Sequence, residues 1–200
     1  MKTIQLLAKT ILGLNLFFAS FAFSQNTINT VNSGNWNDPM VWDCYCVPTS
    51  ADNVVINSYH TVVITATASA NDVLVYNYGG ITFDESKELH VSGNMDLMGY
   101  FVASAGHVFL EGNLPQYIDG NGGVINFNDL TINNAGNHPV DFYYATYTLK
   151  GVFYPLNGGI ALENYAGISF TFLSTSETEN ARIDQIGSSF SFSGDFTVER

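Results

Sequence analysis

Short runs of β-branched and aromatic residues, separated by Gly, Asn, Asp and Ser, make up most of the chain after Gln25. No segment in this part repeats apolar residues at the i, i+3, i+4 and i+7 spacing of an amphipathic helix. Runs of this length, bounded by turn-forming residues, are typical of β-strands. Because Val, Ile, Leu and Phe alternate with polar residues, one face of each strand is expected to be buried. The pattern predicts an all-β protein. The clearest runs span residues 54–56, 62–64, 73–76, 81–83, 108–110, 124–127, 130–132, 160–162, 169–172 and 196–198.

A repeat with a period of about 20 residues distinguishes among all-β folds. The sequence of residues 91–95 recurs in similar form at residues 110–114, 19 positions later, and again at 192–196. Repeats of this length indicate coils of several short strands that stack on one another and share a core. We therefore predict a right-handed parallel β-helix, with a β-sandwich as the alternative because it gives similar strand spacing. Strand-like segments that follow one another at about this period begin at Asn53, Asp72, Glu88, His107, Asp129 and Thr146.

The two ends of the repeat region differ. Residues 25–53 are richer in Trp, Pro and Cys, and we expect them to form an N-terminal cap that covers the unpaired backbone of the first coil. Residues 54–200 are expected to form the β-helical repeats. The chain stops at Val198-Glu199-Arg200, inside a strand-like run, so we expect the repeats to continue beyond Arg200.

Residues 1–24 have the three-part layout of a secretory signal peptide. Lys2 and Lys9 precede a mostly apolar run over residues 10–23, and Ala22 and Ser24 supply small residues before a cut at Gln25. The run is shorter than the roughly 20 apolar residues of a membrane-spanning helix and is interrupted by Asn15. The sequence thus predicts a secreted or outer-cell-surface protein with no membrane span in the mature chain.

The charge balance narrows the range of partners. The chain has 18 acidic residues against 6 Lys and Arg, a formal net charge of −12. Cleavage before Gln25 would leave the 18 acids against Lys87, Lys150, Arg182 and Arg200, a net charge of −14. Binding to nucleic acid requires clustered Lys and Arg, so this class of partner is excluded. An anionic membrane surface is disfavoured for the same reason.

Several motifs resemble a known group of extracellular proteins. Residues 33–39, Trp42 and residues 47–56 are similar to the N-terminal modules of large secreted surface proteins of bacteria that use the type IX secretion system. Residues 127–134, 181–183 and 194–200 resemble the strand-and-turn unit of the same proteins. The opening block, with residues 60–62, is also similar to the eight-glycine extracellular domain. The resemblance implies a β-helical or β-rich region exported to the surface or medium, in a group that includes adhesins, structural stalks and carbohydrate-active enzymes.

Cys44 and Cys46 are the two cysteines of the chain. In an oxidising compartment a disulfide between them is a candidate, although a ring this small requires a bent backbone. Free thiols, two ligands of a shared metal and pairing with residues beyond the chain are the alternatives. A zinc site normally has four ligands, and there is no second cysteine pair.

Residues 119–123 resemble the opening of a calcium loop, with oxygen ligands on Asp119 and Asn121. The twelfth position of such a loop would be Leu130, which cannot supply the distal carboxylate. We therefore favour a glycine-rich turn, expect no cofactor, and keep calcium as a candidate. His60, His90, His107 and His138 lack metal-binding spacing, so structural roles are expected for them.

The aromatic run over residues 142–147 is the best candidate for surface binding. Tyr143, Tyr144 and Tyr147 could stack on sugar rings if they point outward. The competing interpretation is core packing, which we favour because aromatic side chains are mainly core residues.

No G-x-S-x-G, phosphate-loop or H-E-x-x-H motif is present, and no catalytic residue is predicted. The leading hypothesis is a non-catalytic structural or adhesion module whose partners are extracellular glycans or cell-surface proteins. The alternatives are a carbohydrate-active β-helix, similar to a glycoside hydrolase or lyase, and a carbohydrate-binding domain. A groove with two converging carboxylates would favour the hydrolase over the structural stalk.

Overall fold

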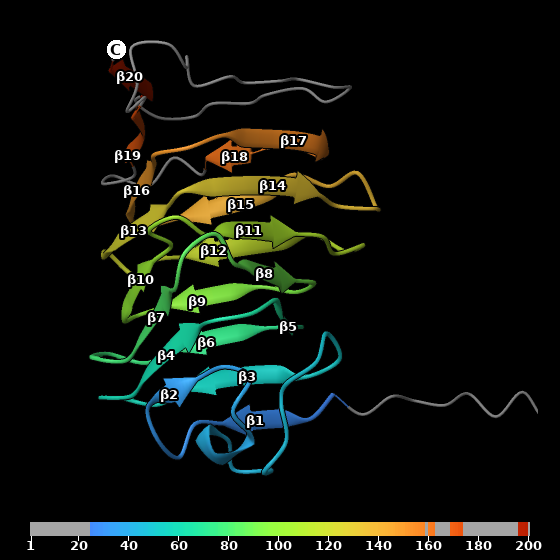
Figure 1. The fold of residues 1–200 in the computed structure, drawn as a ribbon. Coiled ribbons are helices and arrows are strands. Elements are labelled where there is room, and N and C mark those ends of the chain that lie inside the picture. The colour runs from blue at the N-terminus through green and yellow to red at the C-terminus, as the bar shows by residue number, and fades with distance from the viewer. Residues whose placement is uncertain (1–24, 159, 163–168, 174–195, 200) are drawn as a thin grey trace, which may run out of the picture.

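Parallel strands stack in three sheets along one axis and form a β-solenoid of about six turns (Figure 1). The structure is a computed structural model that describes residues 25–158, 160–162, 169–173 and 196–199. The predicted parallel β-helix is confirmed. The β-sandwich alternative is wrong, because the strand pairs of all three sheets are parallel whereas the sheets of a sandwich are antiparallel.

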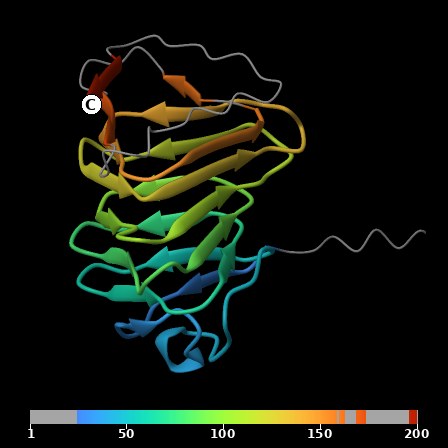
Figure 2. The same ribbon diagram turned by 45° about the horizontal axis from the view of Figure 1, so that its top comes forward.

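Most coils of the solenoid contribute one short strand to each sheet, as the stacked arrows in Figure 2 show. Sheet 1 contains β1 (Thr27–Asn29), β3 (Asn53–Ile56), β6 (Val73–Val75), β9 (Met95–Leu97), β12 (Gln116–Asp119), β15 (Val140–Tyr143) and β18 (Ile160–Leu162). Sheet 2 contains β2 (Gly34–Asn35), β4 (Thr61–Ile64), β7 (Gly80–Phe83), β10 (Tyr100–Val102), β13 (Val124–Phe127), β16 (Thr146–Leu149), β19 (Ser169–Leu173) and β20 (Phe196–Glu199). Sheet 3 contains β5 (Ala68–Ala70), β8 (Glu88–Val91), β11 (His107–Leu110), β14 (Asp129–Asn133) and β17 (Phe153–Asn157).

The core runs along the inside of the three sheets. Buried and partly exposed residues alternate in most strands, as expected for a sheet with one face toward the core. Phe101 is completely buried, and its ring centroid lies 5.8 Å from that of Phe83 and 5.5 Å from that of Phe127. Because these three rings belong to successive coils, they tie neighbouring coils together along the axis.

The 19-residue repeat matches the strand register, since Val91 of β8 lies opposite Leu110 of β11. The six strand starts used for the spacing are not equivalent positions. Glu88, His107 and Asp129 are successive partners in sheet 3. By contrast, Asn53 begins a strand of sheet 1, and Thr146 begins a strand of sheet 2. A period near 20 residues in the sequence therefore predicts the length of one coil, but it does not show which strand belongs to which of the three sheets.

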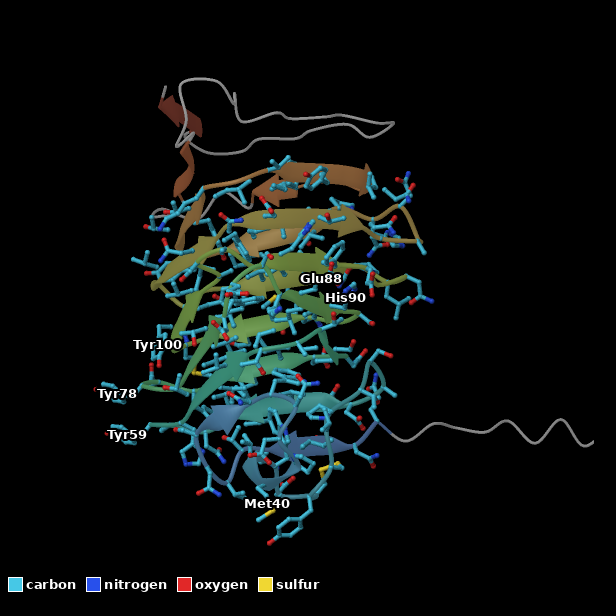
Figure 3. All side chains as sticks on the ribbon, viewed as in Figure 1. Met40, Tyr59, Tyr78, Glu88, His90 and Tyr100 are labelled. Carbon is cyan, nitrogen blue, oxygen red and sulfur yellow. A yellow bond between two sulfur atoms is a disulfide. The ribbon has the colours of Figure 1, made fainter. Side chains whose placement is uncertain are left out.

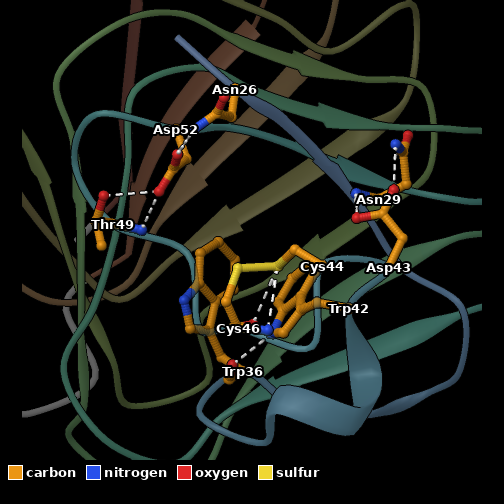
Figure 4. The surroundings of a disulfide bond; sticks show 9 residues. All are labelled: Asn26, Asn29, Trp36, Trp42, Asp43, Cys44, Cys46, Thr49 and Asp52. Atoms are coloured by element: carbon orange, nitrogen blue, oxygen red, sulfur yellow. Dashed lines mark hydrogen bonds between the residues drawn. A yellow bond between two sulfur atoms is a disulfide. The ribbon is translucent and has the colours of Figure 1, made fainter. Parts of the chain in front are cut away.

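The N-terminal segment contributes the end strands of sheets 1 and 2. Strands β1 and β2 pair in parallel with β3 and β4. A short 3-10 helix, η1 (Pro39–Val41), follows β2. Trp36 and Trp42 are fully buried against each other, with ring centroids 5.1 Å apart, and the indole N–H of Trp42 donates to the carbonyl oxygen of Trp36 at 2.8 Å. This pair lies in the segment predicted to form the cap (Figure 4).

A disulfide joins Cys44 and Cys46 in the turn that follows Trp42 (Figure 4). Tyr45, between them, has a φ of 54°, which supplies the bend that so small a ring requires. The turn is also held to β1, because the Asp43 carboxylate accepts hydrogen bonds from the backbone and side-chain nitrogens of Asn29 at 3.1 and 2.8 Å.

Residues 1–24, predicted to be a signal peptide, lie outside the described residues, as do residues 181–183 and most of the third repeat at 192–196. In the part of the chain that the structure describes, no helix is long and apolar enough to span a membrane.

Candidate functional site

A hollow of about 420 Å³ lies on the outer surface of the solenoid, over sheet 1 and its corner with sheet 2. Its lining combines two carboxylates with three phenol rings. The lining residues are Asp96, Tyr117, Asp119, Tyr143 and Tyr144.

The strand register explains why these side chains meet. Asp96 of β9 lies opposite Asp119 of β12, which in turn lies opposite Tyr143 of β15. The neighbouring residues Ile118 and Phe142 are fully buried in the core. Since side chains alternate along a strand, Asp119 and Tyr143 must then point outward. Adjacent strands are about 4.8 Å apart, so the three outward side chains form one column across three coils.

Tyr117 adds a second ring to the hollow. It lies two residues before Asp119 and therefore on the same outer face of β12. Its ring centroid is 5.9 Å from that of Tyr143, with the ring planes at 65°, an edge-to-face arrangement. The Tyr143 hydroxyl also donates to the Asp141 carboxylate at 3.4 Å. These contacts fix the orientation of both rings relative to the two carboxylates.

Burial and neighbouring carboxylates raise the pKa values of two side chains in the hollow. Partial burial, and in second place the Asp119 carboxylate, raises the pKa of Asp96 above its usual range. Burial also raises the pKa of Tyr117, and the nearby carboxylates of Asp96, Asp72 and Asp119 add to the increase. The Tyr117 phenol consequently keeps its proton at neutral pH and can act as a hydrogen-bond donor.

The corner beside the hollow is a tight turn. Asn121 and Gly122 have φ values of 49° and 79°, and Tyr144, at the same corner one coil later, has a φ of 38°. A Cβ atom on Gly122 would lie 3.3 Å from the Tyr144 ring, so glycine allows the ring to pack closely against the turn. The backbone N–H of Asn121 donates to the Asp119 carboxylate at 2.8 Å.

The geometry around Asp119 and Asn121, the calcium candidates, is therefore that of a hydrogen-bonded turn. Across the described residues, no group of three or more His, Cys, Asp or Glu side chains gathers in a metal-binding arrangement. The role of Asp119 that the structure supports directly is its place in the hollow.

Of the three predicted sugar-contact residues, two line the hollow and one does not. Tyr143 and Tyr144 are there, but Tyr147 is fully buried, so its prediction as a contact residue is wrong. Its hydroxyl is hydrogen-bonded to the carbonyl oxygens of Ile118 and Tyr143, and its ring packs against Phe142 at 5.0 Å. Burial raises the pKa of Tyr147 far above its usual range. Core packing, the competing interpretation, holds for this residue.

Sequence reasoning missed Asp96 and Tyr117. They come from different coils than Tyr143, and in the linear sequence each looks like an isolated outward residue of a short strand. An alignment of the coil sequences with one another could have revealed the site, because Asp96, Asp119 and Tyr143 occupy the same position in successive coils.

A second cluster of polar and aromatic side chains covers the outer face of sheet 3. The Phe109 ring is stacked between those of His90 and His107, with centroid distances of 4.4 and 4.0 Å. His90 is also paired with Glu88 at 3.4 Å (Figure 3) and with Glu111 at 3.0 Å. These side chains contact one another, so the cluster orders the surface of the sheet.

No family model, no curated protein and no solved structure matches this chain.

Proposed function

We propose that this chain is an extracellular β-helical adhesion module that binds a carbohydrate in the hollow over sheet 1. The observation that carries the proposal is that Tyr117 and Tyr143, together with Asp96 and Asp119, line about 420 Å³ of open space. This volume falls in the range of about 300–1,000 Å³ that is typical of small-molecule sites.

The chemistry of the lining suits a sugar. A pyranose ring has an apolar C–H face that packs on aromatic rings, and Tyr117 and Tyr143 offer such surface. Its hydroxyl groups donate hydrogen bonds, and the carboxylates of Asp96 and Asp119 each have two oxygen atoms that accept them. Because the hollow is acidic, uronic acids and sulfated sugars are disfavoured, and a neutral or amino sugar fits best.

Export to the cell surface is part of the proposal. It is supported by the layout of residues 1–24, by the excess of acidic side chains, and by the resemblance to surface proteins of bacteria with type IX secretion. A solenoid suits this role, because stacked coils hold a binding surface away from the point of attachment.

The test is a glycan array followed by calorimetric titration with the tightest-binding neutral oligosaccharide. Tyr143→Ala and Asp119→Asn should each weaken binding at least tenfold. Tyr76→Ala is the matched control, since Tyr76 is an exposed tyrosine outside the hollow. Binding that is unchanged in both hollow variants, or weakened equally by the control, would contradict the proposal.

A second candidate function, glycoside hydrolysis, rests on the adjacency of Asp96 and Asp119. Glycosidases use two carboxyl groups about 5–10 Å apart, one of them a proton donor whose pKa is raised. Burial raises the pKa of Asp96, whereas Asp119 lies on the neighbouring strand. Release of reducing ends from a bound oligosaccharide, abolished in Asp96→Asn with binding retained, would establish hydrolysis. Binding without any release would leave the adhesion module as the better description.

A further inference from the structure

Two exposed tyrosines occupy equivalent turns of successive coils. Tyr59 lies in the turn between β3 and β4, and Tyr78 lies in the turn between β6 and β7. Both are at the corner between sheets 1 and 2. Their exposed fractions are 76% and 71%, and both side chains project from the same side of the solenoid (Figure 3).

The backbone at both positions is left-handed, with φ values of 67° and 64°. This region is unfavourable for residues with a Cβ atom and is usually occupied by Gly, Asn or Asp. The same turns contain Asn57 and Asn77, residues that tolerate it better, yet a tyrosine is at each left-handed position. The arrangement therefore directs two phenol rings outward at the same place in consecutive coils.

The two rings are parallel. Their centroids are 5.2 Å apart and their planes differ by 2°, so they stack face to face along the solenoid axis. Each ring turns one face toward the other ring, and both side chains remain largely exposed to solvent. A sugar stacks on a ring face, so this pair is less suited to a glycan than the edge-to-face rings of the hollow.

We propose that Tyr59 and Tyr78 form an oxidative cross-linking site, at which a peroxide-dependent peroxidase joins the two rings as dityrosine. In this reaction each phenol loses one electron and one proton to give a phenoxyl radical. The two radicals couple through one carbon–carbon bond between the ring carbons next to the hydroxyl groups. Each ring then moves a hydrogen from that carbon to its oxygen, which restores the phenol. One hydrogen peroxide accepts the two electrons and two protons and becomes two water molecules.

The geometry favours this pair because radical coupling needs two accessible rings at short range. Both rings are open to a solvent oxidant, and the strand pairing of β3 with β6 and of β4 with β7 holds their turns together. Neighbouring groups on one molecule react at a high effective concentration, so coupling within the chain exceeds coupling between chains in dilute solution. The product would be a covalent tie between two consecutive coils close to the cap.

The experiment oxidises the 200-residue protein in dilute solution with a haem peroxidase and hydrogen peroxide, and follows dityrosine fluorescence and intact mass. The expected product is a monomer that has lost two hydrogen atoms, and that yields a linked peptide pair containing Tyr59 and Tyr78 after digestion. Tyr59→Phe and Tyr78→Phe should each remove this product, since phenylalanine keeps the ring stack but cannot form a phenoxyl radical. Tyr45→Phe is the matched control, because Tyr45 is also 71% exposed and has a positive φ, and it should leave the product unchanged.

Three results would overturn the proposal: no dityrosine in the wild-type monomer, dityrosine that persists in Tyr78→Phe, or a linkage that maps to other tyrosines. A second measurement is thermal unfolding after oxidation. The midpoint should rise in the wild type and in Tyr45→Phe, but not in Tyr59→Phe or Tyr78→Phe. None of these readouts depends on carbohydrate binding, so this proposal and the proposed function can fail separately.

Discussion

Substitutions of Phe101 and Phe109 compare how much the interior and the surface of the solenoid contribute to the free energy of unfolding. Each ring contacts two others, Phe101 those of Phe83 and Phe127 inside the coil stack, and Phe109 those of His90 and His107 outside it. Phe101 is completely buried, whereas Phe109 is partly exposed. The two substitutions to Ala therefore remove the same side chain and the same number of ring contacts in different surroundings.

Phe101→Ala should lower the free energy of unfolding by about 3–5 kcal/mol, the usual effect of truncating a buried Phe in a core that cannot collapse around the cavity. About 0.5–1.5 kcal/mol of this belongs to each ring pair. Phe109→Ala loses similar ring contacts but opens no internal cavity, so about 1–2 kcal/mol is expected.

Urea unfolding followed by circular dichroism measures both values on the same scale. Equal destabilisation by the two substitutions would refute the reasoning, as would a loss below about 2 kcal/mol for Phe101→Ala. Either result would mean that the aromatic column inside the solenoid does not couple neighbouring coils.

Three further outcomes are expected. Gly99→Ala should destabilise the protein by about 1–3 kcal/mol in urea unfolding, because its Cβ atom would lie 2.2 Å from the backbone oxygen of Gly79 in the coil below. Burial lowers the pKa of His107 from its ordinary value of 6.5, an effect to which a neighbouring histidine adds and which two neighbouring carboxylates oppose. The unfolded chain therefore binds a proton first as the pH falls through about 6.5, so stability should decrease there, and His107→Gln should reduce the slope of stability against pH between about 7.5 and 5. Replacing both Cys44 and Cys46 by Ser should lower the free energy of unfolding by only about 1–2 kcal/mol, since the closed loop is very short; a loss above about 4 kcal/mol would show that the disulfide orders the whole cap.

The sequence predicts the average length of one coil, but not which strand belongs to which of the three sheets. Periodicity detects the average coil length, and the match of Val91 with Leu110 shows that the signal was real. The next equivalent position after Met95 is Ile118, not Leu114, because a loop containing the exposed Leu114 is inserted there. The Gln116 side chain follows this loop and donates to the carbonyl oxygen of Gly93 at 2.7 Å, a contact between coils that no linear pattern shows.

Part of the candidate site could be predicted from the sequence, and the rest was missed for a related reason. The aromatic run over residues 142–147 predicts Tyr143 and Tyr144 as candidate surface residues, but this run is divided between two strands, β15 and β16. Tyr144 has a φ of 38°, and β16 begins only at Thr146 with its own alternation, which puts Tyr147 in the core. Asp96 and Tyr117 could be assigned to the same site only once the coils were aligned.

The direction of the hydrogen bonds between coils determines how the module would respond to tension. In a parallel β-helix these bonds run along the solenoid axis, and strands of neighbouring coils are about 4.8 Å apart. A pull along the axis therefore loads the ladders of successive coils in series, and the weakest junction opens first while the others stay closed. Each opened coil would release about 20 residues, or about 60–80 Å of extended chain. A chain built from such coils would lengthen stepwise under tension, and a covalent link between the turns containing Tyr59 and Tyr78 would remove one of those steps.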